Sequence, residues 1–108
     1  MQQAHTNNND IKKAFVDIDE TICFYNGDRV YEEAIPNKSN IEKINKLYKN
    51  GWYIVYWTAR GGLSKIDYYD LTEKQLDSWG AKYHELSVGD KPFYDLIIDD
   101  RAKRIEEL

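Results

Sequence analysis

The amino-acid sequence predicts a single three-layer α/β/α domain around a parallel, Rossmann-like sheet. Apolar runs at residues 14–18, 52–57 and 94–98 have the composition and length of buried strands. The segments between these runs carry apolar residues at helical spacing, and strands that alternate with helices form parallel β-α-β units with right-handed crossovers. With 108 residues and 42% hydrophobic content, the chain can bury one core but not two.

The first strand is predicted at residues 14–18, where an apolar run leads into the acids Asp17 and Asp19. Residues 1–10 precede this strand. They are rich in Gln and Asn and show no apolar period, so we expect a flexible lead-in. The domain itself is therefore expected to occupy residues 11–108.

A small β-hairpin flap is predicted after the first strand. Residues 22–25 and 29–31 flank Asn26-Gly27, a dipeptide suited to the positive φ angles of a tight turn. Phe24 and Tyr25 are candidate substrate contacts on this flap. Packing of the same two rings on the core is an equally weighted alternative.

Two amphipathic helices are predicted on either side of the second strand. The first lies within residues 36–50, before Gly51, and its apolar residues recur at helical spacing: Ile41, Ile44, Leu47 and Tyr48. The second covers residues 70–79 and is closed by Gly80; its pattern rests on Leu71, Gln75, Leu76 and Trp79.

The C-terminal third is predicted to add two strands and a helix. Residues 83–86 form a short outer strand, and residues 94–98 form a buried strand that runs into Asp99 and Asp100. A short terminal helix is expected from Arg101 onward.

Composition narrows the range of partners and compartments. A net charge of −4 lacks the basic footprint that attracts nucleic-acid phosphates, so a nucleic-acid partner is disfavoured. No run of about 20 apolar residues suggests a membrane span, and the N-terminus lacks a secretory signal, so we expect a cytoplasmic protein without a membrane partner. The lone Cys23 cannot form a disulfide within the chain and is expected to be a small buried apolar residue.

Polar residues follow three of the predicted strands, and the carboxyl ends of parallel strands meet at one edge of a sheet. Asp17 and Asp19 follow the first strand, Thr58 the second, and Asp99-Asp100 the last. Four carboxylates at one edge would repel one another, so they call for a cation. Oxygen ligands without a nearby histidine favour Mg²⁺ over zinc, since His5 and His84 lie away from these strand ends in the sequence.

Each of these residues also has an ordinary structural interpretation. An Asp-x-Asp pair is more often a turn or a helix cap than a catalytic pair, and Thr58 is a good cap on its own. Lys91 alone is most often a solvated charge, and Asp99-Asp100 could cap the helix that follows. The functional interpretation therefore rests on the conjunction of the four features.

With these four features taken together, the sequence resembles the haloacid dehalogenase superfamily of phosphohydrolases. The four ordered motifs of that superfamily are an apolar strand with Asp-x-Asp-x-Thr, an apolar strand with Thr or Ser, a Lys, and an apolar strand with Asp-Asp. Here they match residues 17–21 (Asp-Ile-Asp-Glu-Thr), Thr58, Lys91 and Asp99-Asp100. The resemblance extends over residues 15–100 and implies a phosphatase with the haloacid dehalogenase-like fold.

The resemblance also implies a role for each matched residue. Asp17 attacks phosphorus and is transiently phosphorylated, while Asp19 protonates the leaving oxygen and then activates water. Neighbouring acids help keep Asp19 protonated. The Mg²⁺ ligands are the Asp17 carboxylate, the Asp19 main-chain carbonyl and Asp99, with Asp100 bound directly or through water. Thr58, Lys91 and main-chain N–H groups such as that of Ala59 bind the phosphate.

Two features of this chain depart from many members of the superfamily. Glu20 occupies a position where many relatives have Gly, which leaves the geometry of the loop open. The intervals between Thr21 and Thr58 and between Thr58 and Lys91 have no room for a cap domain. An open, capless site either accepts a bulky phosphoester or is covered by a neighbouring copy of the chain. The flap is then the gate, with Phe24, Tyr25 and Arg60 as candidate substrate contacts.

Several functions remain open at the level of sequence. The segment 89–102 is similar to capless phosphatases of bacterial or phage carbohydrate and capsule pathways, which suggests a small sugar-phosphate or polyol-phosphate substrate. Nucleotide or polynucleotide phosphatase activity is one alternative, and phosphoryl transfer to a sugar is another. Lys91-Pro92-Phe93 also resembles receiver signalling domains. In those domains, however, the paired acids follow the first strand and the lysine comes late, after the phosphorylated aspartate, whereas here Lys91 precedes the pair Asp99-Asp100.

Overall fold

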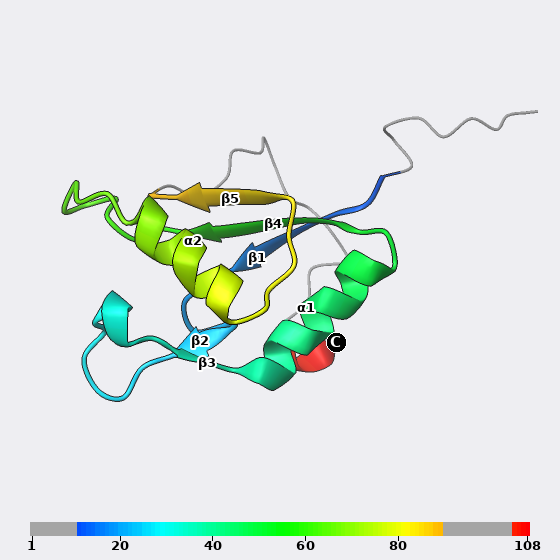
Figure 1. The fold of residues 1–108 in the computed structure, drawn as a ribbon, viewed down its shortest axis with the longest axis horizontal. Coiled ribbons are helices and arrows are strands. Elements are labelled where there is room, and N and C mark those ends of the chain that lie inside the picture. Colours follow the sequence, from blue (N-terminus) through cyan, green and yellow to red (C-terminus); the bar gives the residue numbers. More distant parts are fainter. Residues whose placement is uncertain (1–10, 90–104) are drawn as a thin grey trace, which may run out of the picture.

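The computed structural model describes residues 11–89 and 105–108, and these residues form a small, compact α/β domain (Figure 1). Its centre is a parallel sheet of three strands: β1 (Lys13–Asp17), β4 (Tyr53–Thr58) and β5 (Glu85–Val88), in the order β1-β4-β5. In the register of the sheet, Asp17 pairs with Trp57 and Thr58 pairs with Val88. The predicted first two strands are therefore confirmed, and all three strands end at the same edge of the sheet.

The two predicted helices are also confirmed, as α1 (Lys38–Lys49) and α2 (Tyr69–Ser78). Asn37 caps α1 by accepting a 2.9 Å hydrogen bond from the Asn40 amide, and Gly51 follows the helix with a φ of 95°. Both helices pack on one face of the sheet (Figure 1), because side chains from each join β4 in one core cluster: Ile41, Ile44, Ile54, Tyr56, Leu76 and Trp79.

The described residues supply the sheet and one helical layer of the predicted three-layer architecture. The predicted strand at 94–98, the start of the terminal helix at 101–104 and the lead-in at 1–10 lie outside them. At the C-terminus, Ile105–Glu107 form a 3-10 helix that packs against α1, where Lys43 Nζ donates a 3.4 Å hydrogen bond to the Ile105 carbonyl. In the described part of the chain, no helix is long and apolar enough to cross a membrane.

Two strand predictions are wrong in their details. The flap pairs β2 (Cys23–Phe24) with β3 (Ile35–Pro36), not with residues 29–31, because Tyr31–Glu33 form a 3-10 helix in the connection. The outer strand begins at Glu85 rather than at residue 83. His84 is held just before it, since its amide donates to the Ile54 carbonyl and its Nδ1 accepts from the Ile54 amide.

Candidate functional site

The carboxyl edge of the sheet brings the first two predicted motifs together. Asp17 ends β1 and is half-buried, Asp19 follows it in the turn, and Thr58 ends the neighbouring strand β4. Asp19 and Thr58 are buried, with 7% and 1% of their surface exposed. A carboxylate with so little access to water needs donors to compensate its charge.

The turn after β1 explains the unusual residue at position 20. Glu20 has a φ of 67°, the left-handed region that glycine adopts without strain, and the amides of Thr21 and Ile22 both donate to the Ile18 carbonyl. The Glu20 side chain reaches solvent and lies 3.4 Å from the Arg29 guanidinium. The glutamate therefore keeps the backbone conformation that a glycine favours here.

Asp19 receives its compensation mainly from three side chains, with a weaker 3.5 Å contact from the Cys23 thiol. Thr58 Oγ1 donates a 2.7 Å hydrogen bond to Asp19 Oδ2, and Arg60 Nη2 lies 2.9 Å from Oδ1 in a buried ion pair. The Tyr25 hydroxyl of the flap also donates to Oδ1. These contacts join the turn after β1, the end of β4 and the flap at a single carboxylate.

The same contacts decide the charge state of Asp19. Burial alone would raise its pKa, but the hydrogen bonds from Arg60, Tyr25 and Thr58 and the positive charge of Arg60 outweigh burial and hold the pKa below its usual value. From the sequence we expected neighbouring acids to keep Asp19 protonated. Its described contacts have the opposite effect, because they favour the ionised carboxylate.

Arg60 lies inside the fold, although the sequence suggested it as a substrate contact. None of its side chain is exposed, and its Nη1 donates to Thr72 Oγ1 at 3.1 Å and to Gln75 Oε1 at 2.6 Å, both on α2. Its guanidinium carbon lies 4.9 Å from the centre of the Tyr31 ring. In this conformation Arg60 contacts protein groups rather than solvent.

Sequence reasoning did not identify Thr72 as part of the site, and it assigned Gln75 only to the pattern of an amphipathic helix. The available signal was a polar break in the inner face of α2, where Thr72 is buried beside Leu76 and Trp79. A buried threonine and an inward glutamine need polar partners, which points to an arginine or an acid opposite them.

The two flap candidates differ in their surroundings. Phe24 has 37% of its surface exposed, so part of its side chain is accessible to solvent. Tyr25 is half-buried and packs edge-on against Tyr31, with a centroid distance of 6.4 Å. Tyr25 therefore packs against the domain, the alternative left open for both rings, while Phe24 remains available to a ligand.

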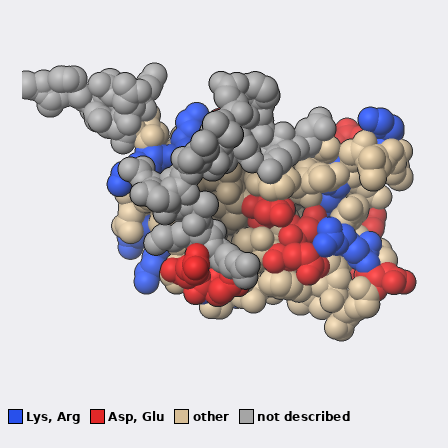
Figure 2. Space-filling model, turned by 180° about the vertical axis from the view of Figure 1, so that it is seen from behind, with Lys and Arg blue, Asp and Glu red and all other residues tan. Residues whose placement is uncertain are grey.

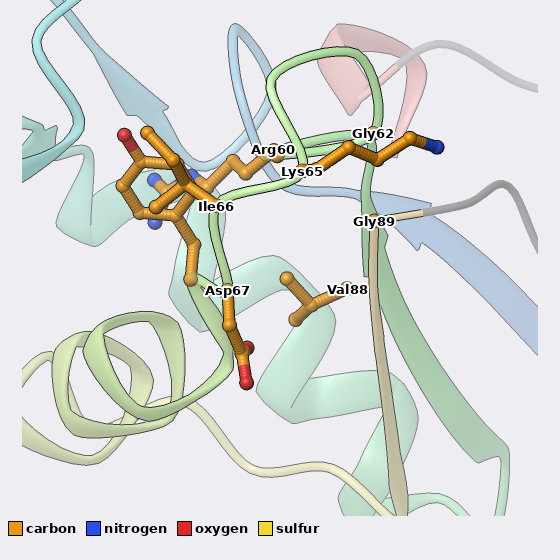
Figure 3. Close-up of a pocket in the computed structure, with 9 residues that line it drawn as sticks. Arg60, Gly62, Lys65, Ile66, Asp67, Val88 and Gly89 are labelled. Carbon is orange, nitrogen blue, oxygen red and sulfur yellow. The ribbon is translucent and has the colours of Figure 1, made fainter.

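A shallow cleft of about 250 Å³ opens between the loop that follows β4 and the end of β5 (Figure 3). Its lining comprises Arg60, Gly61, Gly62, Lys65, Ile66, Asp67, Tyr68, Val88 and Gly89. The side chains of Arg60 and Lys65 run in opposite directions, Arg60 toward the interior. The two walls approach closely, because a Cβ on Gly62 would lie 2.5 Å from the Gly89 carbonyl oxygen.

Cys23 is fully buried and belongs to the core cluster, as expected. Burial and the nearby charge of Asp19 raise the pKa of its thiol to about 12, so the thiol stays protonated at neutral pH. The His84 side chain also has a structural role. Its ring stacks on Tyr53 and Tyr48, at centroid distances of 4.5 and 4.7 Å.

The expected metal site lies partly outside the described residues. Asp99 and Asp100, and the phosphate-binding Lys91, fall in the undescribed segment. Among residues 11–89 and 105–108, no three acidic, cysteine or histidine side chains gather as a metal site. The two described candidate ligands fit a hard cation such as Mg²⁺, because both would bind through oxygen. Asp17 would bind through its carboxylate. The Asp19 carboxylate already contacts Thr58 and Arg60, so Asp19 would bind the metal through its main-chain carbonyl.

Charged side chains surround this end of the sheet on the face opposite α1 and α2. Figure 2 shows that Asp and Glu side chains gather there, with Lys and Arg side chains beside them. The surface that the described residues present in this view is therefore mixed in charge rather than uniformly basic, so these residues alone form no electrostatic footprint for a long polyanion.

Comparison with known proteins identifies one related structure. No protein-family model and no curated protein matches the chain. A crystal structure of a structural-genomics target from Vibrio cholerae is 30% identical, with 90% of this chain and 86% of that chain covered and a TM-score of 0.71. The comparison thus extends over nearly the whole length of both chains.

Proposed function

We propose that the chain, which belongs to the same family as the Vibrio cholerae protein, is a capless magnesium-dependent phosphomonoester hydrolase of the haloacid dehalogenase type. The observation that carries the proposal is the 2.7 Å contact between Asp19 and Thr58, which unites the first and second motifs at the ends of neighbouring parallel strands. A three-layer fold, completed by the residues after Gly89, is part of the proposal.

In the proposed reaction Asp17 is the nucleophile. One of its carboxylate oxygens attacks phosphorus, the bond from phosphorus to the leaving oxygen breaks, and that oxygen takes a proton from Asp19 to leave as an alcohol. A water oxygen then attacks the phosphorus of the aspartyl-phosphate and gives a proton to Asp19, and the bond from phosphorus to the Asp17 oxygen breaks. Inorganic phosphate and free Asp17 result. Bound Mg²⁺ would neutralise charge on the phosphate and on Asp17.

The charge state of Asp19 suits the second step directly. Its contacts with Arg60, Tyr25 and Thr58 favour the carboxylate, which is the form that accepts a proton from water. The first step needs the protonated form. The negative charge of a phosphate bound beside Asp19 would raise its pKa and thus favour proton uptake before the leaving group departs.

The substrate that we propose is a small sugar phosphate or polyol phosphate. The cleft of about 250 Å³ between the loop after β4 and the end of β5 is not lined by Asp17 or Asp19, but it has room for the sugar or polyol part of such a substrate, and Lys65 and Asp67 in its lining offer charged partners for hydroxyl groups. A nucleotide or polynucleotide phosphatase is the second candidate, because the open cleft and the exposed Phe24 ring would tolerate a larger, stackable leaving group.

The direct test is phosphate release from para-nitrophenyl phosphate, with and without Mg²⁺, for the parent, Asp17→Asn and Asp77→Asn. Asp77 is an exposed acid on α2 and serves as a matched control. We expect Mg²⁺-dependent turnover in the parent and the control, and a loss of at least about 10³-fold in Asp17→Asn. Full activity in Asp17→Asn, or a parent that holds one phosphate without turnover, would rule out this mechanism, and the second result would favour a receiver-like domain.

A further inference from the structure

We infer that Arg60 is the positioning residue of Asp19: its guanidinium ties the Asp19 carboxylate to helix α2 and fixes the direction in which the carboxyl group faces the leaving oxygen. The inference rests on the proposed function and assigns to Arg60 a role other than the substrate contact that the sequence suggested.

The guanidinium holds Asp19 through two of its nitrogens. Nη2 lies 2.9 Å from Oδ1, and Nε lies 3.1 Å from Oδ2 and 3.3 Å from Oδ1. Two parallel donors fix both the position and the plane of a carboxylate, which one donor cannot do. Thr58 then donates to Oδ2 from β4, so the carboxylate has little freedom to rotate.

The other end of the guanidinium is fixed to a rigid element. Nη1 donates to Thr72 and Gln75, which lie one turn apart on α2. Each of these partners is itself held, since Thr72 Oγ1 donates to the Tyr68 carbonyl at 2.7 Å and Gln75 Nε2 donates to the Tyr31 carbonyl at 2.7 Å. The orientation of Asp19 is therefore set by a helix rather than by the turn in which it lies.

Stability alone does not account for this arrangement. A buried ion pair contributes little compared with a well-packed apolar pair, because desolvation of both charges offsets their attraction. What the pair provides is geometry: all three guanidinium nitrogens have acceptors, and Tyr31 covers the group at 4.9 Å. Proton transfer depends steeply on such geometry, which is the physical reason to assign a positioning role.

The test measures release of the leaving group in a single turnover, which isolates the first displacement. Two substrates are compared: para-nitrophenyl phosphate, whose leaving group departs without a proton, and glycerol phosphate, whose leaving group needs one. Arg60→Lys keeps the charge but loses the two-pronged contact. We expect it to slow glycerol release by about 10²-fold and nitrophenol release by less than about threefold.

A second variant protects the test against a folding defect. Thr72→Val keeps the shape of the side chain but removes one acceptor of Nη1, so it loosens Arg60 without touching Asp19. We again expect glycerol release to slow more than nitrophenol release, but by a smaller factor, about 3- to 10-fold. Lys74→Arg, the reverse exchange at an exposed residue of α2, is the control and should leave both rates unchanged. Thermal unfolding of each variant verifies the fold.

The outcomes separate this inference from the proposed function. Asp19→Asn should show the same selectivity, and Arg60→Lys in the Asp19→Asn background should add no further loss, because both act through one proton. Equal losses for the two substrates, or a faster glycerol release in Arg60→Lys, would overturn the positioning role. A parent without Mg²⁺-dependent phosphate release would instead overturn the proposed function.

Discussion

The hydroxyl of Thr58 donates a 2.7 Å hydrogen bond to Asp19, and both groups are buried at the edge where β1 and β4 end. The bond is charge-assisted and shielded from water, so its loss cannot be replaced by solvent. The main-chain amide of Arg60 also donates to the same hydroxyl, at 3.3 Å. Thr58 therefore links the local backbone of the loop after β4 to the carboxylate.

We predict that Thr58→Val lowers both stability and activity. Valine has nearly the same shape, so the change removes the hydroxyl but little packing, and Asp19 loses one of its donors. The free energy of unfolding should fall by about 1–3 kcal/mol, and kcat on an aryl phosphate by about 10²-fold. Urea denaturation and steady-state kinetics measure the two effects.

Thr58→Ser is the matched control for this prediction. Serine keeps the hydroxyl and loses one methyl group, so its loss of stability should be close to 1 kcal/mol and its activity should stay near that of the parent. A serine variant as inactive as the valine variant would mean that the methyl group, and not the hydrogen bond to Asp19, matters at this position.

Tyr56 offers a prediction in the opposite direction. It is fully buried in β4, and within the described residues its hydroxyl has no hydrogen-bond partner. A buried polar group without a partner is costly, so Tyr56→Phe should raise the free energy of unfolding by about 1 kcal/mol. Thermal denaturation would register this as a higher Tm.

Tyr53→Phe, three residues earlier on the same strand, is the control for Tyr56→Phe. Its hydroxyl donates a 2.6 Å hydrogen bond to Glu85 at the surface, where water can replace the lost partner. The change in the free energy of unfolding should stay within about 0.5 kcal/mol. If Tyr56→Phe is destabilising instead, its hydroxyl has a partner outside residues 11–89 and 105–108.

The buried Cys23 thiol should make the fold less stable as the pH rises into the alkaline range. Burial, followed by the charge of Asp19, raises the pKa of the thiol from 9.0 to about 12. In the unfolded chain the thiol loses its proton at lower pH than in the fold. Its contribution to stability is therefore complete below pH 9.0 and is lost as the pH rises toward about 12.

Urea denaturation between pH 7 and pH 11 tests this prediction, with Cys23→Ala as the comparison. We expect the parent to lose more stability than Cys23→Ala over the alkaline part of that range. The same burial predicts that iodoacetamide modifies Cys23 slowly in the native state and rapidly in urea. Rapid native-state modification at neutral pH would show that the thiol is accessible.

Local sequence patterns were sufficient to predict most of the secondary structure. The helical periods of α1 and α2 and the apolar runs of β1 and β4 each lie within one segment, and burial of one face stabilises each element. The parallel direction of the strands follows from the alternation of strands and helices. The strand at 94–98, with Asp99 and Asp100, remains a prediction outside the described residues.

The flap was mispredicted because its pairing is decided by distant contacts. Asn26-Gly27 is a strong local turn signal, yet β2 pairs with Ile35–Pro36. Two contacts favour that register: the Asn37 amide donates to the Ile22 carbonyl at 2.8 Å, and the Tyr31 ring packs at 4.9 Å from that of Tyr68. Neither contact is visible in the residues 22–31 that suggested the hairpin.

The interior position of the Arg60 side chain could not be predicted from the sequence either. An arginine between alanine and glycine in a loop normally reaches solvent, and its acceptors on α2 lie 12 and 15 residues further along the chain. Only the folded arrangement brings Thr72, Gln75 and Asp19 around one guanidinium. The motif residues Asp19 and Thr58 could be predicted because strand ends converge. The side chains that hold Asp19 in place could not be predicted.

The turn residue Glu20 gives the last prediction. Its φ of 67° is unfavourable for any residue with a Cβ, so Glu20→Gly should relieve strain, while the exposed ion pair with Arg29 that it removes contributes little. Glu20→Ala removes the same ion pair but keeps the Cβ. We therefore expect the glycine variant to be more stable than the alanine variant by about 1 kcal/mol, measured by urea denaturation. Equal stabilities would mean that the left-handed turn after β1 is not maintained in solution, and the placement of Asp19 against Thr58 would then need another cause.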